Sequence, residues 1–329
     1  MGHQPELANT RLMSTERSRP RLALVGVGSM GSNHARVIAE SAEAELAMII
    51  DTDATRAERL ARTYGCEHAV DLAAAARCDA AVVATPTRLH AEQARALLDM
   101  KLPLLVEKPL TPCIDETLAL IAAANDADLP LMCGFVERFN PAVQTVLGLL
   151  EDSPVHIVGM RHSPHTPRTT LSVTLDLLIH EIDCALLYTG RSVPARVCSA
   201  IGMLPQGTVS DAAGCLLTFD SGAVATLSAS RTSQRKLRWQ IVDTLTASYE
   251  VDLLRQDITV YRHRGHELAG AVTYRAETVI DIPFVRHAGE PLALQLRHFV
   301  SLLAGRGDVA AERVSIAAPH EVAALVEAA

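Results

Sequence analysis

Three side chains that suit acid–base chemistry on a hydroxyl group stand out in the sequence: Lys108, Asp176 and His180. Asp176 and His180 lie four residues apart in an apolar stretch of helical composition, and Asp183 follows one turn later. Because positions i, i+4 and i+7 share one face of a helix, these acidic and imidazole groups are predicted to point into one cleft. An imidazole exchanges protons near neutral pH, and an ammonium group stabilises a developing alkoxide.

Each of these residues also has an alternative interpretation. Lys108 could be a solvated loop lysine, and His180 could be a structural helix histidine. Asp176 and His180 could share a metal ion, but no third ligand cluster accompanies them, so no metal is predicted. Asp183 is expected to orient or cap its neighbours rather than to react.

The position of Lys108 follows from the element before it. The apolar run 102–106 predicts a buried strand that ends just before Glu107-Lys108-Pro109. In doubly wound α/β folds, ligands bind at the carboxyl ends of the parallel strands, which is where Lys108 would lie. Glu107 is expected to support the Lys–Pro bond.

A glycine-rich turn occurs early in the chain, where Gly26, Gly28 and Gly31 have the spacing G-x-G-x-x-G. It follows an apolar run and precedes a helix predicted over 33–44, and Asp51 ends the next apolar run. This context is typical of a dinucleotide site, in which the glycines turn the chain, admit the pyrophosphate and let the helix pack closely. Asp51 is expected to bind the adenosine ribose and to repel a 2′-phosphate, so NAD is predicted over NADP.

Strand-like and helical stretches alternate over the first 140 residues, which predicts a doubly wound parallel sheet of the Rossmann type. The expected strands are 21–26, 46–50, 78–84, 102–106 and 130–135, and the expected helices are 33–44, 55–64, 90–100 and 115–124. Beyond Pro141, closely spaced strand-like runs favour an α+β domain with an open, mostly antiparallel sheet.

The second half has a similarly regular pattern. Its expected strands are 155–161, 195–200, 212–219, 223–229, 237–243, 248–253 and 258–261, and its expected helices are 142–150, 171–188, 291–303 and 319–328. The predicted organisation is a disordered tail over 1–20, an NAD-binding Rossmann domain over 21–140, and a substrate-binding and oligomerisation domain over 141–329.

The composition is that of a globular protein. Of the 329 residues, 49% are hydrophobic and 21% are charged, and the net charge is −8. The acidic balance argues against nucleic-acid binding, and no apolar run is long enough to cross a bilayer. The seven cysteines stand singly without a CxxC pair, which is typical of free thiols in a reducing compartment. We therefore expect a cytoplasmic protein that acts on small molecules.

Several further motifs occur in order along the chain. They are Val82-Val-Ala-Thr85-Pro86-Thr-Arg-Leu-His90, Glu107-Lys108-Pro109, Gly134-Phe-Val-Glu-Arg138-Phe-Asn140-Pro141 and Asp176-Leu-Leu-Ile-His180-Glu-Ile-Asp183. With these motifs the sequence resembles the glucose–fructose oxidoreductase, inositol dehydrogenase and rhizopine-catabolism (Gfo/Idh/MocA) family from Arg21 onwards. The last two motifs are most similar to those of members that oxidise C3 of UDP-N-acetylglucosamine, although Leu178 stands where most members have glycine.

The resemblance implies that substrate lies between the two domains and faces the nicotinamide. It also implies that Lys108, Asp176 and His180 form the catalytic set, and members differ in whether the histidine or the lysine takes the proton. The candidate cofactor-binding residues are Gly26, Gly28, Ser29, Met30, Gly31, Asp51, Thr85, Pro86, His90, Glu107 and Lys108. The candidate substrate-binding residues are Lys108, Arg138, Asn140, His165, Arg168, Asp176 and His180.

Some of these assignments have structural alternatives. Arg138 and Asn140 could seal the joint between the domains instead of contacting substrate. The basic segment 161–168 is predicted to be a loop, which could receive a diphosphate or could be an ordinary surface loop. His90 could be a helix-surface residue.

The predicted function is that of an NAD-dependent dehydrogenase that converts a secondary hydroxyl of a sugar, the one at C3, to a ketone. The sugar could be a nucleotide-linked N-acetylhexosamine or a unit of an aminoglycoside-type pathway. The alternatives are an inositol or cyclitol dehydrogenase and a non-catalytic NAD-binding sensor. The resemblance further implies a homo-oligomer, a dimer or tetramer, often formed through the open sheet face.

Overall fold

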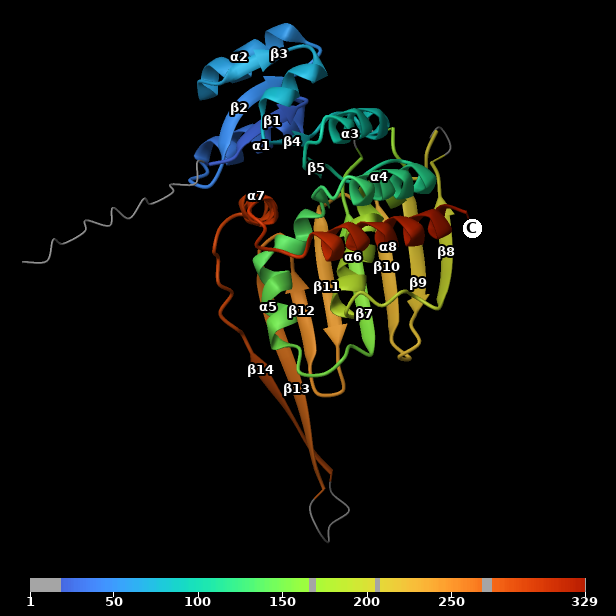
Figure 1. The fold of residues 1–329 in the computed structure, drawn as a ribbon. Coiled ribbons are helices and arrows are strands. Elements are labelled where there is room, and N and C mark those ends of the chain that lie inside the picture. Colours follow the sequence, from blue (N-terminus) through green and yellow to red (C-terminus); the bar gives the residue numbers. More distant parts are fainter. Residues whose placement is uncertain (1–18, 166–169, 205–207, 268–273, 329) are drawn as a thin grey trace, which may run out of the picture.

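The structure, a computed structural model, describes residues 19–165, 170–204, 208–267 and 274–328. The tail predicted over residues 1–20 lies almost wholly outside these ranges. Figure 1 shows two sheets, one above the other, with helices α4 (Ile114–Asp126) and α8 (Val309–Glu327) between them. Within the described ranges, no helix is long and apolar enough to cross a membrane.

The first half of the chain forms a six-stranded parallel sheet with the strand order β3-β2-β1-β4-β5-β6. Its strands are β1 (Arg21–Val25), β2 (Glu45–Ile50), β3 (Glu67–Ala69), β4 (Ala80–Val83), β5 (Leu104–Val106) and β6 (Leu131–Cys133). Every residue of β4, β5 and β6 is buried, as expected for strands that helices cover on both faces. The predicted Rossmann sheet is confirmed, and the short strand β3 is an addition to it.

The helices that connect these strands differ from the prediction mainly at the first one. They are α1 (Ser29–Glu40), α2 (Ala54–Tyr64), α3 (His90–Asp99) and α4, with short 3-10 segments η1 (Leu72–Arg77), η2 (Thr87–Leu89) and η3 (Val136–Phe139). The helix expected over 33–44 was placed too late, because Gly31 was read as part of the turn. Gly31 lies inside α1, and a Cβ there would be 1.9 Å from the carbonyl oxygen of Gly26, so it is needed for close packing.

The second half forms an eight-stranded sheet with the order β14-β13-β12-β11-β7-β10-β9-β8. Its strands are β7 (His156–His162), β8 (Arg196–Gly202), β9 (Ala212–Thr218), β10 (Val224–Ser230), β11 (Leu237–Asp243), β12 (Ser248–Asp252), β13 (Asp257–Glu267) and β14 (Tyr274–Asp281). The mostly antiparallel sheet is confirmed, although β13 is longer than predicted and β14 was missed. One pair, β7 and β10, runs parallel with Ser230 opposite His162, so the loops after both strands lie at one edge.

Helices cover one face of this second sheet (Figure 1): α5 (Pro141–Leu149) and α6 (Ile179–Tyr188), with α8 packed against α6. The segment before α6, η4 (Thr174–Leu178), is a π-helical turn. Nine of the ten residues of α6 are buried, including His180, Glu181 and Asp183. Polar groups inside such a helix need hydrogen-bond or ionic partners, because a buried unpaired charge is strongly destabilising.

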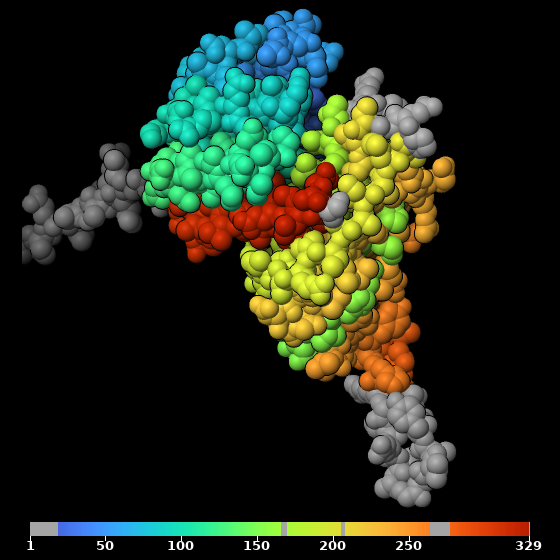
Figure 2. Space-filling model, turned by 90° about the vertical axis from the view of Figure 1, so that its right-hand side faces the viewer, coloured from blue at the N-terminus to red at the C-terminus, as the bar shows by residue number. Residues whose placement is uncertain are grey.

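The last two helices pack against the first half of the chain. Leu296 and Phe299 of α7 (Pro291–Leu303) share a core cluster with Leu22 and Leu24 of β1. Figure 2 shows the C-terminal segment, in red, between the N-terminal domain and the second sheet. A division at residue 140 therefore separates the two sheets, whereas the final helices contact both halves.

Helix α8 begins at Val309 rather than at Pro319, where the prediction placed its start. Proline is common in the first turn of a helix, which suggested a start there. Instead, Pro319 is buried inside the helix. Asp308 caps the true start, where its carboxylate accepts a hydrogen bond from the Ala311 N–H (2.9 Å).

A buried group of charges joins the two halves. Arg138 in η3 donates to both carboxylate oxygens of Asp183 in α6, with distances of 2.6–3.1 Å, and to the Ser315 hydroxyl of α8 at 2.7 Å. Glu312 of α8 is 3.4 Å from the same guanidinium. The Arg138 and Asp183 side chains are only 5% and 2% exposed.

This joint corrects three expectations about the site. Asp183 does not face a cleft with Asp176 and His180, because its carboxylate is buried against Arg138. Arg138 and Asn140, which were expected to contact substrate, have other partners. Arg138 belongs to the joint. Asn140 accepts a hydrogen bond from the Ala142 N–H (3.0 Å) and donates one to the Leu253 carbonyl (3.1 Å). The alternative of a seal between the domains fits both residues.

Replacing Arg138→Met is expected to lower the free energy of unfolding by about 3–5 kcal/mol, because Asp183 and Glu312 would stay buried without their counter-charge. Urea denaturation followed by circular dichroism measures this. Arg138→Lys keeps the positive charge, so it should lower the free energy of unfolding by less. Unchanged unfolding of the methionine variant would show that the joint does not stabilise the fold.

Candidate active site

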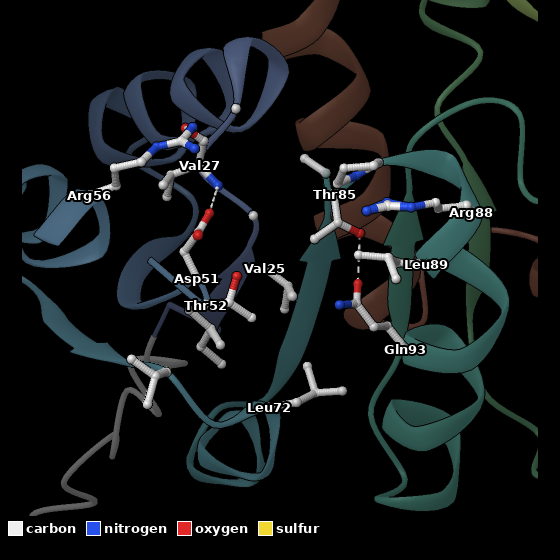
Figure 3. A pocket seen from close by; sticks show the side chains of 16 residues that line it. Val25, Val27, Asp51, Thr52, Arg56, Leu72, Thr85, Arg88, Leu89 and Gln93 are labelled. Carbon is white, nitrogen blue, oxygen red and sulfur yellow. Dashed lines mark hydrogen bonds between the residues drawn. The ribbon is translucent and has the colours of Figure 1, made fainter. Parts of the chain in front are cut away.

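A cavity of about 410 Å³ opens at the carboxyl ends of β1, β2 and β4 (Figure 3). Five predicted cofactor-binding residues line it, namely Gly26, Gly28, Asp51, Thr85 and Pro86. It is also lined by residues that the sequence analysis did not single out, including Thr52, Arg56, Arg88, Leu89 and Gln93. The cavity lies where doubly wound folds bind their ligands.

Two glycines shape the entrance of this cavity. Gly26 has a φ of +93°, and a Cβ there would lie 2.7 Å from a methyl carbon of Thr85, so a larger residue would strain the turn. At Gly28 an added Cβ would meet nothing within 4 Å, which leaves space for a ligand to approach the backbone. These are the roles that the glycine spacing predicts.

The start of α1 is suited to an anion. No side chain caps it, and its first turn contains no acidic residue. The N–H groups at the start of a helix have no partner within the helix, and the helix dipole adds positive character there. Ser29 and Met30 occupy this exposed end. The geometry fits a pyrophosphate beside Gly28.

Asp51 is fixed in the cavity wall. Its Oδ2 accepts the Val27 N–H (2.8 Å), as Figure 3 shows, and its Oδ1 accepts the Asp53 N–H (2.9 Å). A carboxylate oxygen accepts more than one hydrogen bond, so both oxygens can still bind ribose hydroxyls. Arg56, on the same wall, is held by its donation to the Val27 carbonyl (2.9 Å). The residues present therefore fit an NAD molecule.

Not every predicted cofactor-binding residue lies at the cavity. His90 is buried, and its two ring nitrogens contact the carbonyls of Pro109 (3.0 Å) and Thr85 (2.9 Å). It therefore holds the backbone of two loops, and the expectation that its side chain binds cofactor is wrong. Thr85 instead donates to Gln93 (2.6 Å), which is the next polar side chain on this wall (Figure 3).

Lys108 reaches from the end of β5 to the π-helical turn of the second half. Its Nζ donates to the backbone carbonyl of Asp176 (2.6 Å) and to the Asp176 carboxylate (3.1 Å). The two side chains are 18% and 28% exposed, so the pair remains accessible from solvent. Lys108, predicted at the end of a strand, and Asp176, predicted on a helix, are therefore in contact.

His180 lies in the first turn of α6 and is 7% exposed. Its Nδ1 has no hydrogen-bond partner among the described residues. Burial, followed by the positive charges of Arg161, Lys108 and Arg238, lowers the pKa of His180 well below its ordinary value. The imidazole is therefore uncharged at pH 7.

A buried ionic network supports α6 beside His180. Arg161 donates to Glu181 (2.8 Å) and to Glu137 (2.8 Å), and Gln240 donates to the second oxygen of Glu181 (2.6 Å). Burial acts against ionisation of Glu137, but the charges of Arg161 and Arg238 outweigh it and lower the pKa of Glu137. Arg161, the last residue of the expected strand 155–161, is a buried residue of β7 and does not belong to an exposed basic loop.

Arg231, at the end of β10, is a residue that sequence reasoning missed. It is buried, and its Nε lies 3.6 Å from the Asp176 carboxylate without a hydrogen-bond partner among the described residues. Lys108 and Arg231 therefore place one positive charge beside each oxygen of Asp176. The only sequence signal was a lone arginine after an apolar strand, which is too common to indicate a site.

The edge next to Asp176 carries more basic side chains. The loops after β7 and β10 are joined by hydrogen bonds from the Ser163 N–H to the Ser230 carbonyl (2.8 Å) and from the Ser233 N–H to the Ser163 carbonyl (3.2 Å). The exposed or half-exposed basic side chains on these loops and the adjoining strand ends are His162, His165, Arg235, Lys236 and Arg238. Arg168, a predicted substrate-binding residue, lies outside the described residues.

The site combines Lys108, Asp176 and His180 with a neighbouring dinucleotide cavity. This combination is typical of hydride transfer coupled to proton transfer at a hydroxyl group. In the part of the chain that the structure describes, no group of three or more His, Cys, Asp or Glu residues could hold a metal ion.

Two protein-family models match the chain: an oxidoreductase family with an NAD-binding Rossmann fold over residues 20–135, and the GFO/IDH/MocA C-terminal domain over residues 155–250. UDP-N-acetylglucosamine 3-dehydrogenase of Acidithiobacillus ferrooxidans is 32% identical over 321 residues, which are 94% of this chain and 97% of that protein. An inositol 2-dehydrogenase of Rhizobium meliloti is 29% identical over 64% of this chain and 68% of its own length.

Solved structures agree with this result. A structure of the Acidithiobacillus ferrooxidans enzyme has a TM-score of 0.82 at 28% identity, with 94% of this chain and 97% of that chain covered. Levoglucosan dehydrogenase in complex with NADH and levoglucosan has the same fold, with a TM-score of 0.77 at 19% identity over 94% of this chain and 97% of its own. The chain described here belongs to the Gfo/Idh/MocA family of NAD-dependent oxidoreductases.

Proposed function

We propose that this enzyme oxidises the C3 hydroxyl of a nucleotide-linked N-acetylhexosamine, with NAD as the acceptor, and releases the 3-ketosugar. The observation that carries the proposal is the contact of Lys108 with Asp176 next to the neutral His180. The 32% identity to a UDP-N-acetylglucosamine 3-dehydrogenase over nearly the whole chain supports the class of substrate.

The residues have distinct tasks in this reaction. When bound, NAD supplies the acceptor for the hydride that leaves the substrate carbon. His180 takes the proton of the reacting hydroxyl, because its ring is uncharged and can accept one. Lys108 stabilises the alkoxide that develops as the proton leaves, an electrostatic effect that commonly contributes about 10²–10³ in turnover. Asp176 orients the Lys108 ammonium and accepts a hydrogen bond from a neighbouring substrate hydroxyl.

The basic edge supports a substrate that carries a diphosphate. Arg235 and Lys236 lie exposed on the loop after β10, and His165 lies on the loop after β7. This local positive charge contrasts with the net charge of −8 of the whole chain. A diphosphate would be attracted to this edge, whereas a cationic aminoglycoside would be repelled.

An inositol dehydrogenase is the second candidate, and the relatives named as inositol 2-dehydrogenases favour it. Inositol carries several secondary hydroxyls and no phosphate, so it would use Lys108 and His180 but not the basic edge. A sensor without turnover has less support, because Lys108 and Asp176 are in contact and ready for chemistry.

We also propose that the enzyme works in the cytoplasm. All seven cysteines are unpaired in the structure, including the buried Cys78, Cys133, Cys184 and Cys215. Unpaired thiols persist in a reducing compartment. A fractionation experiment that found the protein in an oxidising compartment would contradict this location.

The open face of the second sheet supports a homo-oligomer. Trp239 lies opposite Met160, and Ile241 lies opposite Val158, on the face away from α6. The described helices lie on the other face of the sheet (Figure 1), and the exposed Leu216 lies on this one. An apolar patch that contains the single tryptophan of the chain is typical of a protein–protein interface. A second copy of the chain, in a dimer or tetramer, would bury it.

A substrate panel tests the proposed activity. NADH formation should be faster with UDP-N-acetylglucosamine than with myo-inositol or an aminoglycoside, because only the first matches both the site and the basic edge. The double variant Arg235→Glu, Lys236→Glu should raise KM for the UDP-sugar roughly tenfold through lost charge attraction. Lys101→Glu is the matched control. Lys101 lies before β5, at the end opposite Lys108, and its substitution should leave KM for the UDP-sugar unchanged. Turnover of inositol alone would overturn the proposal in favour of the second candidate.

The role of His180 predicts a particular pH dependence. In the wild type, kcat/KM should stay high through the ordinary range of histidine titration and fall only at lower pH, because protonation of His180 is disfavoured. His180→Gln should lower kcat by about 10²–10⁴ and abolish that acid limb. NADH binding, measured by fluorescence, should be unchanged because the cofactor cavity belongs to the other half. A variant with normal turnover would assign the proton to Lys108 or water.

The oligomer proposal predicts the effect of one substitution on the open sheet face. Ile241→Arg would bury a charge at an apolar interface, so it should convert the oligomer to a monomer in size-exclusion chromatography with light scattering. Thr63→Arg, at an exposed position of α2 in the other half of the chain, should leave the oligomer intact. A wild-type chain that is monomeric at assay concentrations would contradict the proposal.

A further inference from the structure

A buried histidine that no motif analysis singled out connects the cofactor helix to the loop of Lys108. His34 lies in α1, one turn after Gly31, and is 1% exposed. Its Nε2 is 2.7 Å from the Oε1 of Glu107, a residue 73 positions away in the chain. His34 Nδ1 has no partner among the described residues, so Glu107 is the polar partner through which this ring can act.

Glu107 is itself held tightly in place. Its backbone N–H donates to the Val83 carbonyl (2.9 Å), and its Oε2 accepts the backbone N–H of Lys108 (3.2 Å). Gly134 packs against it so closely that an added Cβ would lie 3.0 Å from both its Cα and its Oε2. The Glu107 side chain therefore fixes the backbone from which the Lys108 side chain departs.

The charge state of Glu107 suits this task. Burial opposes its ionisation, but the interaction with His34, the positive charge of Lys108 and the Lys108 backbone N–H outweigh burial and lower the pKa of Glu107. The carboxylate is thus ionised at neutral pH. An ionised acceptor makes stronger hydrogen bonds to the His34 ring and to the Lys108 N–H than a neutral one would.

These contacts form an unbroken chain between two parts of the site. The start of α1 faces the cofactor cavity, Gly31 locks that helix onto the glycine turn, and His34 on the same helix holds Glu107. Glu107 holds the backbone of Lys108, whose ammonium contacts Asp176 in the other domain. Each link is a direct contact between buried or half-buried groups.

We infer that His34 and Glu107 are positioning residues, which hold Lys108 where its ammonium can reach the reacting oxygen while the dinucleotide lies on the same helix. This role rests on the function proposed above, in which Lys108 stabilises the alkoxide. Neither residue touches substrate. A misplacement of about 1 Å in a reacting group can cost about a hundredfold in rate, so the fixed backbone matters to turnover.

Substitutions at His34 distinguish an effect on the position of Lys108, which lowers kcat, from an effect on the stability of the fold, which lowers Tm. His34→Leu keeps the volume and removes the link, and it should lower kcat roughly ten- to a hundredfold while leaving NADH affinity unchanged. His34→Gln can place an amide nitrogen near the position of Nε2 and should restore much of kcat. Ile38→Val, buried in the same helix without contact to Glu107, is the matched control: it should lower Tm without lowering kcat.

A second readout needs no substrate. The chain contains three lysines, Lys101, Lys108 and Lys236, so labelling with [ε-13C]lysine gives three side-chain signals, and the loss of one in Lys108→Arg assigns it. His34→Leu should displace the Lys108 signal and leave the other two in place. Glu107→Gln should do the same, which keeps the test available if the His34 variant fails to fold.

The outcomes distinguish the two proposals. If the UDP-sugar is not the substrate, the lysine signals still report whether His34 positions Lys108. Wild-type kcat in His34→Leu, or three lysine signals unmoved in both variants, would overturn the positioning role. A fall in Tm alone, equal to that of Ile38→Val, would reduce the pair to a structural contact and overturn it as well.

Discussion

The contact between Lys108 and Asp176 is the constraint on which the rest of the site depends. Lys108 follows a strand of the first sheet, Asp176 belongs to a helical turn on the second, and the two meet at 3.1 Å. A reaction that needs a cofactor from one domain and a base from the other requires this closeness. The buried Arg138–Asp183 pair serves the same end, because it ties the segment after the first sheet to α6 on the second.

Bringing the two domains together in this way requires that α6 carry ionisable groups into the core. Glu181 and Asp183 each need a buried arginine, and Arg161 and Arg138 supply the charges. Burial lowers the pKa of His180 most, and the positive charge of Arg161 lowers it further. The ionic network therefore stabilises the helix and also contributes to the protonation state of the base, so the packing of α6 and its chemistry cannot be changed independently.

The parts of the site that could be predicted from sequence are those set by local spacing. Gly26, Gly28 and Asp51 act within one strand–turn–helix–strand unit, so their roles follow from the order of residues alone. His34 and Arg231 could not be recognised, because their partners are distant in sequence and become neighbours only when the sheets assemble. Asp183 was misplaced for a related reason: a helical face predicts direction, but the partner that captures a side chain belongs to another element.

The return of α7 to the first sheet has a consequence for how the chain is made. Leu296 and Phe299 complete a cluster whose other members were synthesised at the beginning of the chain. The nucleotide-binding half therefore leaves the ribosome with part of its apolar surface uncovered until α7 has emerged. This half would therefore depend on chaperones during synthesis. Without α7 it would also not fold when expressed alone or fused to another protein.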